Sequence, residues 1–363
     1  MSTDRFGFEL ESEQASYSFC IPHNKLRKRE SKWLKMFDKW DYYMSKKSDL
    51  IRVRCQKGIP YSLRGKAWRY LTHSYILEEQ HPGLFNDLVR QADKIANPND
   101  LSAIIKDLHR TFPANETFAD EKGRDELRRV LSALAAYKPE HGYCQAMSPI
   151  VATLLMHMPA ESAFWVMVRI LEDYLPGYFS DGLFSLQVDC EIFGMLLPSF
   201  APRLAAHMKS IGAVPSVILL EWFMCLFCRT LPFSCALRVI DIFMYEGPIA
   251  LMKAALSLSI LKMGSSYDKY STVNEFYPAM RELSPEITHE SVLIPYMFSL
   301  KVKQKQIERL HLVSEERIKQ EQAATAKRRS EYKQRQAEHN LLSVSSEGSR
   351  GSTPSPTIRL SNE

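Results

Sequence analysis

Apolar residues recur at every third or fourth position along most of the chain, which is the pattern of amphipathic helices. Clear examples are the stripes Leu101, Ile104, Ile105 and Leu108; Leu127, Val130, Leu131 and Leu134; and Phe164, Trp165, Val168 and Leu171. The clearest strand-like alternation, from Ile51 to Cys55, is short and isolated. We therefore predict an all-α fold built from many helices of medium length.

The N-terminal part of the chain is expected to lie outside the main domain. Residues 1–24 have no clear period and should form a flexible N-terminus. Residues 25–56 should contain an amphipathic helix followed by a linker. The rings and apolar side chains that share one face of this helix are Trp33, Leu34, Phe37, Trp40 and Tyr43. Packing of this face on the main domain is favoured over a separate recognition element.

The rest of the chain divides into three parts. The main helical domain is predicted at residues 57–300, beginning at a turn that contains Gly58 and Pro60. Residues 301–340 are rich in charged residues with only a thin apolar stripe, so they should form an exposed helix. Residues 341–363 are rich in Ser, Gly and Pro and should be a disordered tail.

The net charge of +5 is concentrated near the C-terminus. Residues 301–340 hold 11 Lys and Arg against 6 Glu, so the remainder of the chain is close to neutral. A nucleic-acid-binding domain would carry its positive charge on the folded part. We therefore predict no nucleic-acid partner.

Cysteine usage and hydropathy predict a cytoplasmic protein. Most of the 7 cysteines lie inside apolar runs, which is typical of reduced, buried thiols. Cys225 and Cys228 form a CxxC pair without a second ligand pair nearby, so no metal site is expected. Neither a secretory signal nor an apolar run of the roughly 20 residues that a bilayer requires is present. A membrane would be reached through a partner or a peripheral contact.

No nucleotide-binding loop or hydrolase signature occurs, but two polar segments are unusual. The first runs from Ile104 to Arg110, where Asp107 lies three residues before Arg110 and can orient it. The second runs from His141 to Met147 and presents the Gln145 amide, which both donates and accepts hydrogen bonds. Alone, the first reads as a surface ion pair and the second as a turn contact.

Together these segments resemble the TBC-domain family, the Rab GTPase-activating proteins. The matching patterns are IxxDxxR at Ile104, Asp107 and Arg110, YxQ at Tyr143 and Gln145, and RGxxW at Arg64, Gly65 and Trp68. They occur in the family's order within a resemblance that covers about residues 57–270. The segments around them look like the TBC family-member-ten group, which also carries alanine at the position of Ala146.

The resemblance implies a GTPase-activating protein that completes the hydrolysis site of a GTP-bound Rab and so regulates vesicle traffic. Arg110 would be the arginine finger and Gln145 the glutamine finger, with Asp107 holding the arginine and Tyr143 supporting the glutamine loop. Arg64, Gly65 and Trp68 would be structural.

GTP and Mg²⁺ would belong to the Rab, so the chain would need no cofactor and have no independent active site. Recruitment to endosomal or plasma membranes would follow from the partner. The alternative function is a Rab-binding scaffold or effector without catalysis.

Overall fold

The computed structural model describes residues 3–9, 21–139, 141–180 and 182–347. Throughout these residues the regular elements are helices, and the only β-pairing is two isolated bridges, Thr3 with Glu9 and Phe8 with Asn115. The prediction of an all-α fold is thus confirmed. The chain divides into two compact units, residues 1–314 and 315–363.

The helices are, in chain order, α1 (His23–Phe37), α2 (Trp40–Lys46), α3 (Ser48–Gln56), η2 (Tyr61–Leu63), α4 (Arg64–Leu71), α5 (Ser74–Gln80), α6 (Leu84–Ile95), α7 (Pro98–Leu108), α8 (Glu116–Ala119), α9 (Glu121–Tyr137), α10 (Met147–Leu155), α11 (Ala160–Arg169), η3 (Ile170–Tyr174), α12 (Phe184–Phe200), α13 (Pro202–Ser210), α14 (Ser216–Met224), α15 (Phe233–Glu246), α16 (Ile249–Met263), η4 (Tyr267–Lys269), α17 (Val273–Arg281), α18 (Pro285–Thr288), α19 (Glu290–Ser299) and α20 (Gln304–Glu347).

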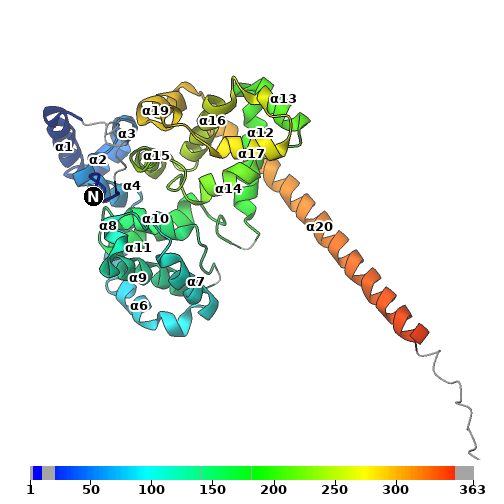
Figure 1. The fold of residues 1–363 in the computed structure, drawn as a ribbon. Coiled ribbons are helices and arrows are strands. Elements are labelled where there is room, and N and C mark those ends of the chain that lie inside the picture. The colour runs from blue at the N-terminus through cyan, green and yellow to red at the C-terminus, as the bar shows by residue number, and fades with distance from the viewer. Residues whose placement is uncertain (1–2, 10–20, 140, 181, 348–363) are drawn as a thin grey trace, which may run out of the picture. The chain divides into compact units, whose positions relative to one another are not determined.

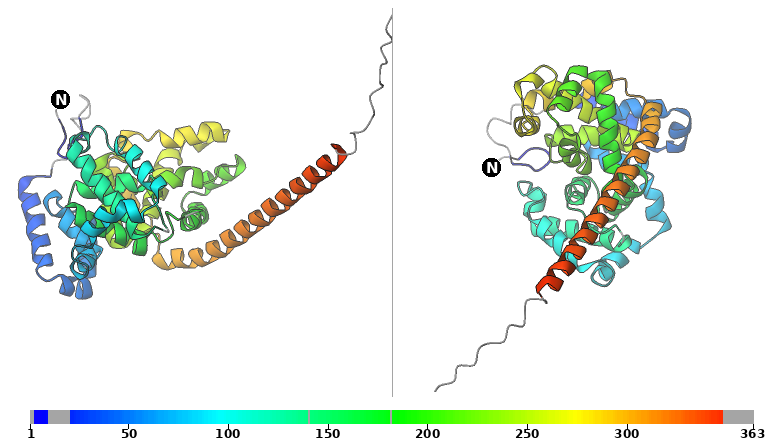
Figure 2. Two further views of the ribbon diagram at one scale, coloured as in Figure 1. Left: turned by 90° about the horizontal axis from the view of Figure 1, so that it is seen from below. Right: turned by 90° about the vertical axis from the view of Figure 1, so that its right-hand side faces the viewer.

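Two helices act as the centres around which the first unit packs (Figure 1). Helix α9 contacts α6, α7, α8, α10 and α11, and helix α16 contacts α12, α14, α15 and α17 to α19. Helix α16 is apolar on nearly all sides, so it can be buried all round rather than along one stripe. The right-hand view of Figure 2 shows the cyan and teal group around α9 below the green and yellow group around α16.

The N-terminal residues differ from the expectation of a flexible segment followed by one helix and a linker. Residues 3–9 pack on the domain, and Phe6 is only 8% exposed. The supposed linker is the helix α3, because Ile51 and Cys55 lie one turn apart and are both buried. Val53, which the apparent alternation placed with them, is 40% exposed. Leu34 is also exposed, so it does not share the buried face of α1.

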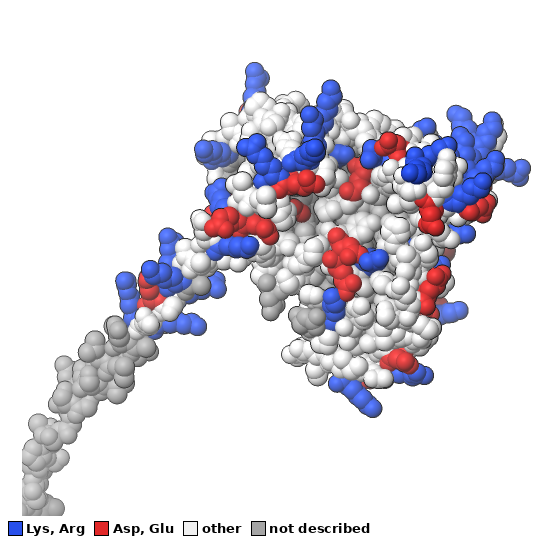
Figure 3. All heavy atoms as spheres, turned by 180° about the vertical axis from the view of Figure 1, so that it is seen from behind, with Lys and Arg blue, Asp and Glu red and all other residues white. Residues whose placement is uncertain are grey.

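Positive charge in the first unit gathers at one edge. Figure 3 shows a group of Lys and Arg side chains at the right, where the view from behind places α1. The basic residues of this helix are Lys25, Arg27, Lys28, Arg29, Lys32 and Lys35, against the single acidic residue Glu30. The near-neutral net charge of the chain outside residues 301–340 therefore averages over an uneven surface.

The second unit contains most of α20, which extends to Glu347. The predicted charged helix of residues 301–340 thus corresponds to a helix that begins at Gln304 and continues through residues 341–347. The remainder of the predicted disordered tail, residues 348–363, lies outside the described residues.

Candidate functional site

Arg110 lies in the turn that follows α7, and not on the helix itself. The Asn97 side chain caps α7 by accepting a hydrogen bond from the backbone N–H of Asn99 at 2.9 Å, and Pro98 occupies the first helical position. The helix ends at Leu108, and the N–H of Arg110 bonds to the carbonyl of Asp107 at 3.2 Å. Asp107 and Arg110 therefore contact each other across the turn at the end of α7, and not along a continuous helix.

Asp107 connects the two polar segments that the sequence singled out. One carboxylate oxygen, Oδ1, accepts from Arg110 Nε at 2.6 Å, and Arg110 Nη2 lies against the same oxygen. The other oxygen, Oδ2, accepts from the hydroxyl of Tyr143 at 2.7 Å. Asp107 is 3% exposed whereas the Arg110 side chain is 58% exposed, so a buried anion holds a cation that faces solvent. This is more than the surface ion pair that the spacing alone suggested.

A second contact joins the same two segments beside Asp107. The Thr111 hydroxyl donates to the carbonyl of Asp107 at 2.7 Å and lies 2.7 Å from the hydroxyl of Ser148, the second residue of α10. Both side chains are buried. Burial, followed by the hydrogen bond to Asp107, raises the pKa of Tyr143 well above its ordinary value. Tyr143 therefore stays protonated and acts as a donor to the carboxylate.

Gln145 lies at the exposed tip of the segment that enters α10. Its backbone carbonyl accepts from the N–H of Ser148 at 3.2 Å, which fixes the backbone of an exposed residue. Within the described ranges, the Gln145 amide has no hydrogen-bond partner. Gly142 allows the preceding turn, because it has φ +61° and a Cβ there would lie 2.9 Å from Asp100 Oδ2.

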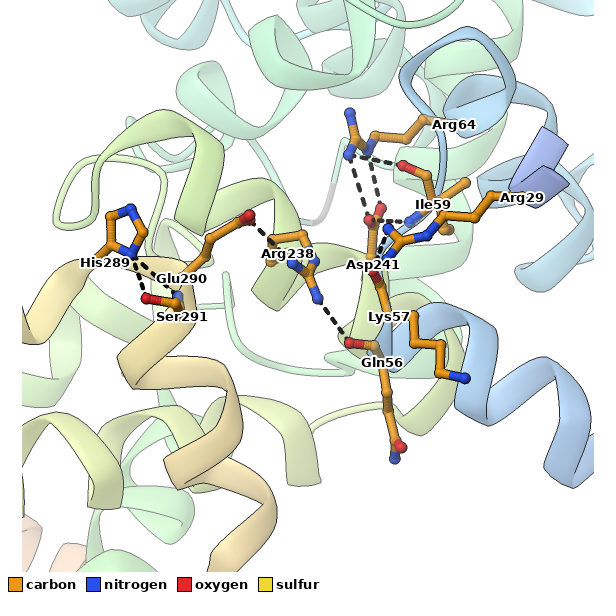
Figure 4. Close-up of polar contacts among 10 residues, drawn as sticks. All are labelled: Arg29, Gln56, Lys57, Ile59, Arg64, Arg238, Asp241, His289, Glu290 and Ser291. Atoms are coloured by element: carbon orange, nitrogen blue, oxygen red, sulfur yellow. Dashed lines mark hydrogen bonds and ion pairs between the residues drawn. The ribbon is translucent and has the colours of Figure 1, made fainter. Parts of the chain in front are cut away.

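The RGxxW residues lie in the core, and two of them, Arg64 and Trp68, donate to the buried Asp241 of α15. Figure 4 shows the part of this cluster formed by Arg64, Ile59 and Asp241. Asp241 Oδ1 accepts from Arg64 Nε and from Trp68 Nε1, each at 3.0 Å, and Asp241 Oδ2 accepts from the N–H of Ile59 at 2.9 Å. Arg64 also donates to the carbonyl of Ile59 at 3.1 Å. The cluster fixes the start of α4 against α15, which is a structural role.

Sequence reasoning missed Asp241, although a signal was present. It is the only acidic residue in the apolar run from Val239 to Phe243, and a carboxylate in such a run requires buried donors. Arg238, on the adjacent turn of α15, pairs with Glu290 of α19 at 3.0 Å and donates to the carbonyl of Gln56 at 2.7 Å (Figure 4). These contacts join α3, α15 and α19.

Gly65 is required by the close approach of α4 to the segment after α10. A Cβ at this position would lie 2.0 Å from the carbonyl oxygen of His157, which no side chain can occupy. The His157 ring packs edge-on against Trp68, with ring centroids 5.1 Å apart. Arg64 thus pairs with Asp241, and Gly65 permits the close approach to His157. Trp68 donates to Asp241 and also packs against the His157 ring.

The described residues contain neither a candidate metal site nor a candidate membrane-spanning helix. No group of three or more His, Cys, Asp or Glu side chains there is arranged to hold a metal ion. Helices in the same part of the chain that are long enough to cross a bilayer are not apolar enough to do so.

The chain is similar to known proteins of one family. The model of the Rab-GTPase-TBC domain matches residues 61–267. The chain is 44% identical over 320 residues to TBC1 domain family member 10A of Mus musculus, covering 85% of this chain and 62% of that relative. It is 43% identical over 316 residues to TBC1 domain family member 10B of Mus musculus, covering 85% and 39% respectively. The chain thus spans less than two thirds of the length of these two relatives.

A solved structure supports the same assignment at the level of the fold. The Chlamydomonas flagellar RabGAP TBC domain has a TM-score of 0.65 and 24% identity to this chain, covering 82% of this chain and 99% of that one. Because the family model covers more than half of the 363 residues and the resemblance seen in the three motifs is confirmed, the chain belongs to the Rab-GTPase-TBC domain family.

Proposed function

We propose that this chain accelerates GTP hydrolysis on a Rab-family small GTPase by supplying Arg110 and Gln145 in trans. The observation that carries the proposal is the position of Asp107, which is buried and bonded to both Arg110 and Tyr143. One carboxylate therefore ties the arginine to the segment that carries Gln145. A surface ion pair without a function would not require a buried anion at this junction.

Hydrolysis of GTP requires charge stabilisation and an aligned water more than covalent help. Water adds to the γ-phosphorus while the bond to the β–γ bridging oxygen breaks, and negative charge develops on the phosphate oxygens. An arginine supplied in trans neutralises this charge and is worth on the order of 10³–10⁵ in rate, or roughly 4–7 kcal/mol of barrier. The solvent-facing guanidinium of Arg110, held at its Nε and Nη2 by Asp107, leaves donor N–H groups for phosphate oxygens.

Gln145 supplies the complementary group. Its carboxamide oxygen accepts a hydrogen bond from the attacking water while its NH₂ donates one to a phosphate oxygen, so that one planar group aligns nucleophile and phosphate. An exposed amide whose backbone is fixed by Ser148 suits this role, because little of its own hydrogen bonding must be broken on docking. The nucleotide and Mg²⁺ belong to the GTPase.

The deciding experiment is single-turnover GTP hydrolysis by a panel of purified Rabs, with the wild-type chain and three variants. Arg110→Lys keeps the charge but loses the fork-shaped donor set, and should lose most of the acceleration. Gln145→Ala should lose a large part of it even on a Rab that has its own glutamine. Asp125→Asn, in an exposed aspartate–arginine pair of α9, serves as the control.

The outcomes separate the two fingers from each other and from a scaffold. Full acceleration by Arg110→Lys would refute the arginine finger. Full acceleration by Gln145→Ala would refute the second finger and leave the first. A chain that binds GTP-loaded Rab without any acceleration would be a Rab-binding scaffold, and the proposed activity would be wrong.

A further inference from the structure

We infer that the N-terminal segment, residues 3–9, is a brace that positions the arginine finger, and that Phe8 is its positioning residue. The inference rests on the proposed role of Arg110. It concerns the turn that follows α7, residues 109–115, which we call the arginine loop. This loop carries Arg110 and must keep its shape while the guanidinium faces solvent.

The N-terminal segment is hydrogen-bonded along the far end of the arginine loop. The N–H of Glu9 donates to the carbonyl of Ala114 at 3.2 Å, and the Asn115 side chain donates to the carbonyl of Phe6 at 2.8 Å. Just beyond the loop, the N–H of Glu116 donates to the carbonyl of Gly7 at 2.8 Å. These contacts join positions more than 100 residues apart in sequence.

The segment has a fixed shape of its own, so it can act as a rigid brace. Asp4 Oδ1 accepts from the N–H groups of Phe6 and Phe8 at 2.8 and 3.0 Å. Gly7 has φ +83°, and a Cβ there would lie 2.8 Å from Glu116 Cγ. The turn therefore fits closely against the residue that follows the arginine loop.

Phe8 extends this brace to the middle of the arginine loop. Its ring packs edge-on against Phe112, with centroids 5.6 Å apart, and also against Phe233 of α15, with centroids 4.8 Å apart. Phe112 and Phe233 contact each other at 6.0 Å. The three rings form one cluster that links the N-terminal segment, the arginine loop and the core helix α15.

Phe112 needs such a support because of its backbone conformation. Its φ is +46°, in the left-handed region that is uncommon for a residue with a bulky side chain. Such a conformation persists only where the surroundings impose it. On one side of Phe112, Thr111 is anchored to Asp107 and Ser148. On the other side, the Phe112 ring packs against Phe8, Phe118 and Phe233. Phe8 is the nearest of the three, so its loss would remove part of this support and let the two residues after Arg110 relax.

Relaxation of the loop should reduce the rate of hydrolysis at saturation more than the affinity for the GTPase. Arg110 would spend less time in the position fixed by Asp107, and displacement of a catalytic group by about 1 Å can lower a rate by on the order of 100-fold. Arg110 is one of many contacts that a docked GTPase makes. The concentration of the chain that gives half of the maximal rate should therefore change little.

The test uses the full chain with Phe8→Ala, and Phe298→Ala as the control. Phe298 is a half-buried phenylalanine of α19 with the same truncation and no ring contact to this cluster among the described residues. Phe8→Ala should lower the maximal single-turnover rate by roughly tenfold or more, while Phe298→Ala leaves it within about twofold. Phe8→Leu, which restores apolar packing against Phe112, should recover most of the loss. Equal rates for Phe8→Ala and wild type, when Arg110→Ala is inactive, would overturn the brace alone.

Two further measurements distinguish positioning from general destabilisation. In an Arg110→Ala background, Phe8→Ala should cause no further loss of rate, since it acts through Arg110. A second loss of the same size would refute the inference. Amide hydrogen exchange in residues 109–115 should accelerate in Phe8→Ala but not in Phe298→Ala.

The exchange measurement needs no GTPase, so it separates failure of the brace from failure of the proposed function. A wild-type chain inactive on every Rab would overturn the proposed function, while faster exchange in the arginine loop would still support the brace. Unchanged exchange in Phe8→Ala would refute the brace whatever the activity of the chain.

Discussion

A buried aspartate with two donors behaves differently from an aspartate in a surface ion pair, and Asp107 shows why. Its low exposure gives its charge a stronger hold on Arg110 than water would allow. Its second oxygen is satisfied by Tyr143, so neither oxygen is left unpaired in the interior. At the scale of the residue, the site is thus an exposed cation whose direction is set by a buried anion.

Replacement of Asp107 by asparagine should separate positioning from binding. Asp107→Asn keeps the size of the side chain and one acceptor oxygen, but it removes the charge that pairs with Arg110. We expect the maximal rate of Rab GTP hydrolysis to fall by roughly tenfold, with the half-saturating concentration nearly unchanged. The matched control is Asp125→Asn, because Asp125 also precedes an arginine by three residues but is half-exposed. Equal effects of the two substitutions would contradict the role given to Asp107.

Among the helices, the position of α4 is set by its close approach to the segment after α10 and by the buried cluster around Asp241. Helix α4 meets the segment after α10 at Gly65, and Arg64 and Trp68 reach Asp241 of α15 from the same helix. A helix of eight residues has little stability of its own. Its position therefore depends on these tertiary contacts.

Two helical glycines provide a matched test of that close approach. Gly65→Ala should lower the free energy of unfolding by roughly 2–3 kcal/mol or more, because its Cβ would lie 2.0 Å from the carbonyl oxygen of His157. Gly194→Ala in α12 should instead raise it by about 0.5–1 kcal/mol, because the nearest atom to its Cβ is Pro215 Cγ at 3.7 Å and alanine favours the helix. Urea unfolding of both variants decides the matter. A mild effect at Gly65 would mean that α4 can shift.

The same contact predicts a pH dependence of stability. Burial, together with the nearby charge of Arg64, holds the pKa of His157 well below its ordinary value of 6.5. The folded state therefore keeps His157 neutral, while the unfolded chain binds a proton below pH 6.5, so stability falls as the pH falls. The wild-type free energy of unfolding should therefore fall by about 1.4 kcal/mol more than that of His157→Phe when the pH is lowered from 7.5 to 5.5. A difference that stays constant with pH in urea unfolding would refute this.

At the scale of the whole molecule, the first unit carries both polar segments and both helix centres. The last buried side chains among those described are Ser314 and Ile318, and the side chains described from Lys319 to Gln336 are exposed. Exposed residues of this kind contribute little to the free energy of unfolding. Folding and the proposed activity should therefore depend on the first unit, which ends at Ser314.

Two truncations test where the folded part ends. A chain that stops after Gln320 should keep its melting temperature within about 1 °C and its hydrolysis rate within about twofold. A chain that stops after Leu312 lacks the buried Ser314 of the first unit and should have a lower melting temperature, by roughly 2–4 °C for each kcal/mol of stability that is lost. Thermal unfolding monitored by circular dichroism distinguishes them. A large loss in the longer chain would show that the exposed part of α20 has a structural role.

The sequence was sufficient for the class of the fold, for the motifs and for the family, because each depends on local information. Periodic apolar residues require helices whatever their neighbours, and the pair Asp107 and Arg110 is visible from spacing alone. The bounds of individual helices were harder to predict from the sequence. The alternation from Ile51 to Cys55 resembled a strand, but these residues form the helix α3. Three apolar residues are too few to distinguish the period of a strand from that of a helix.

Which distant residues contact one another could be known only from the folded protein. Asp107 and Tyr143 are 36 residues apart, Arg64 and Asp241 are 177 apart, and Phe8 and Phe112 belong to segments that no local pattern connects. A hydrogen bond or a ring contact depends on which distant segments of the chain pack together, and composition and periodicity do not reveal this. Local patterns of residues were enough to predict an all-helical chain with two unusual polar segments. The packing of α7 beside the start of α10 determined that Asp107 of one segment bonds to Tyr143 of the other.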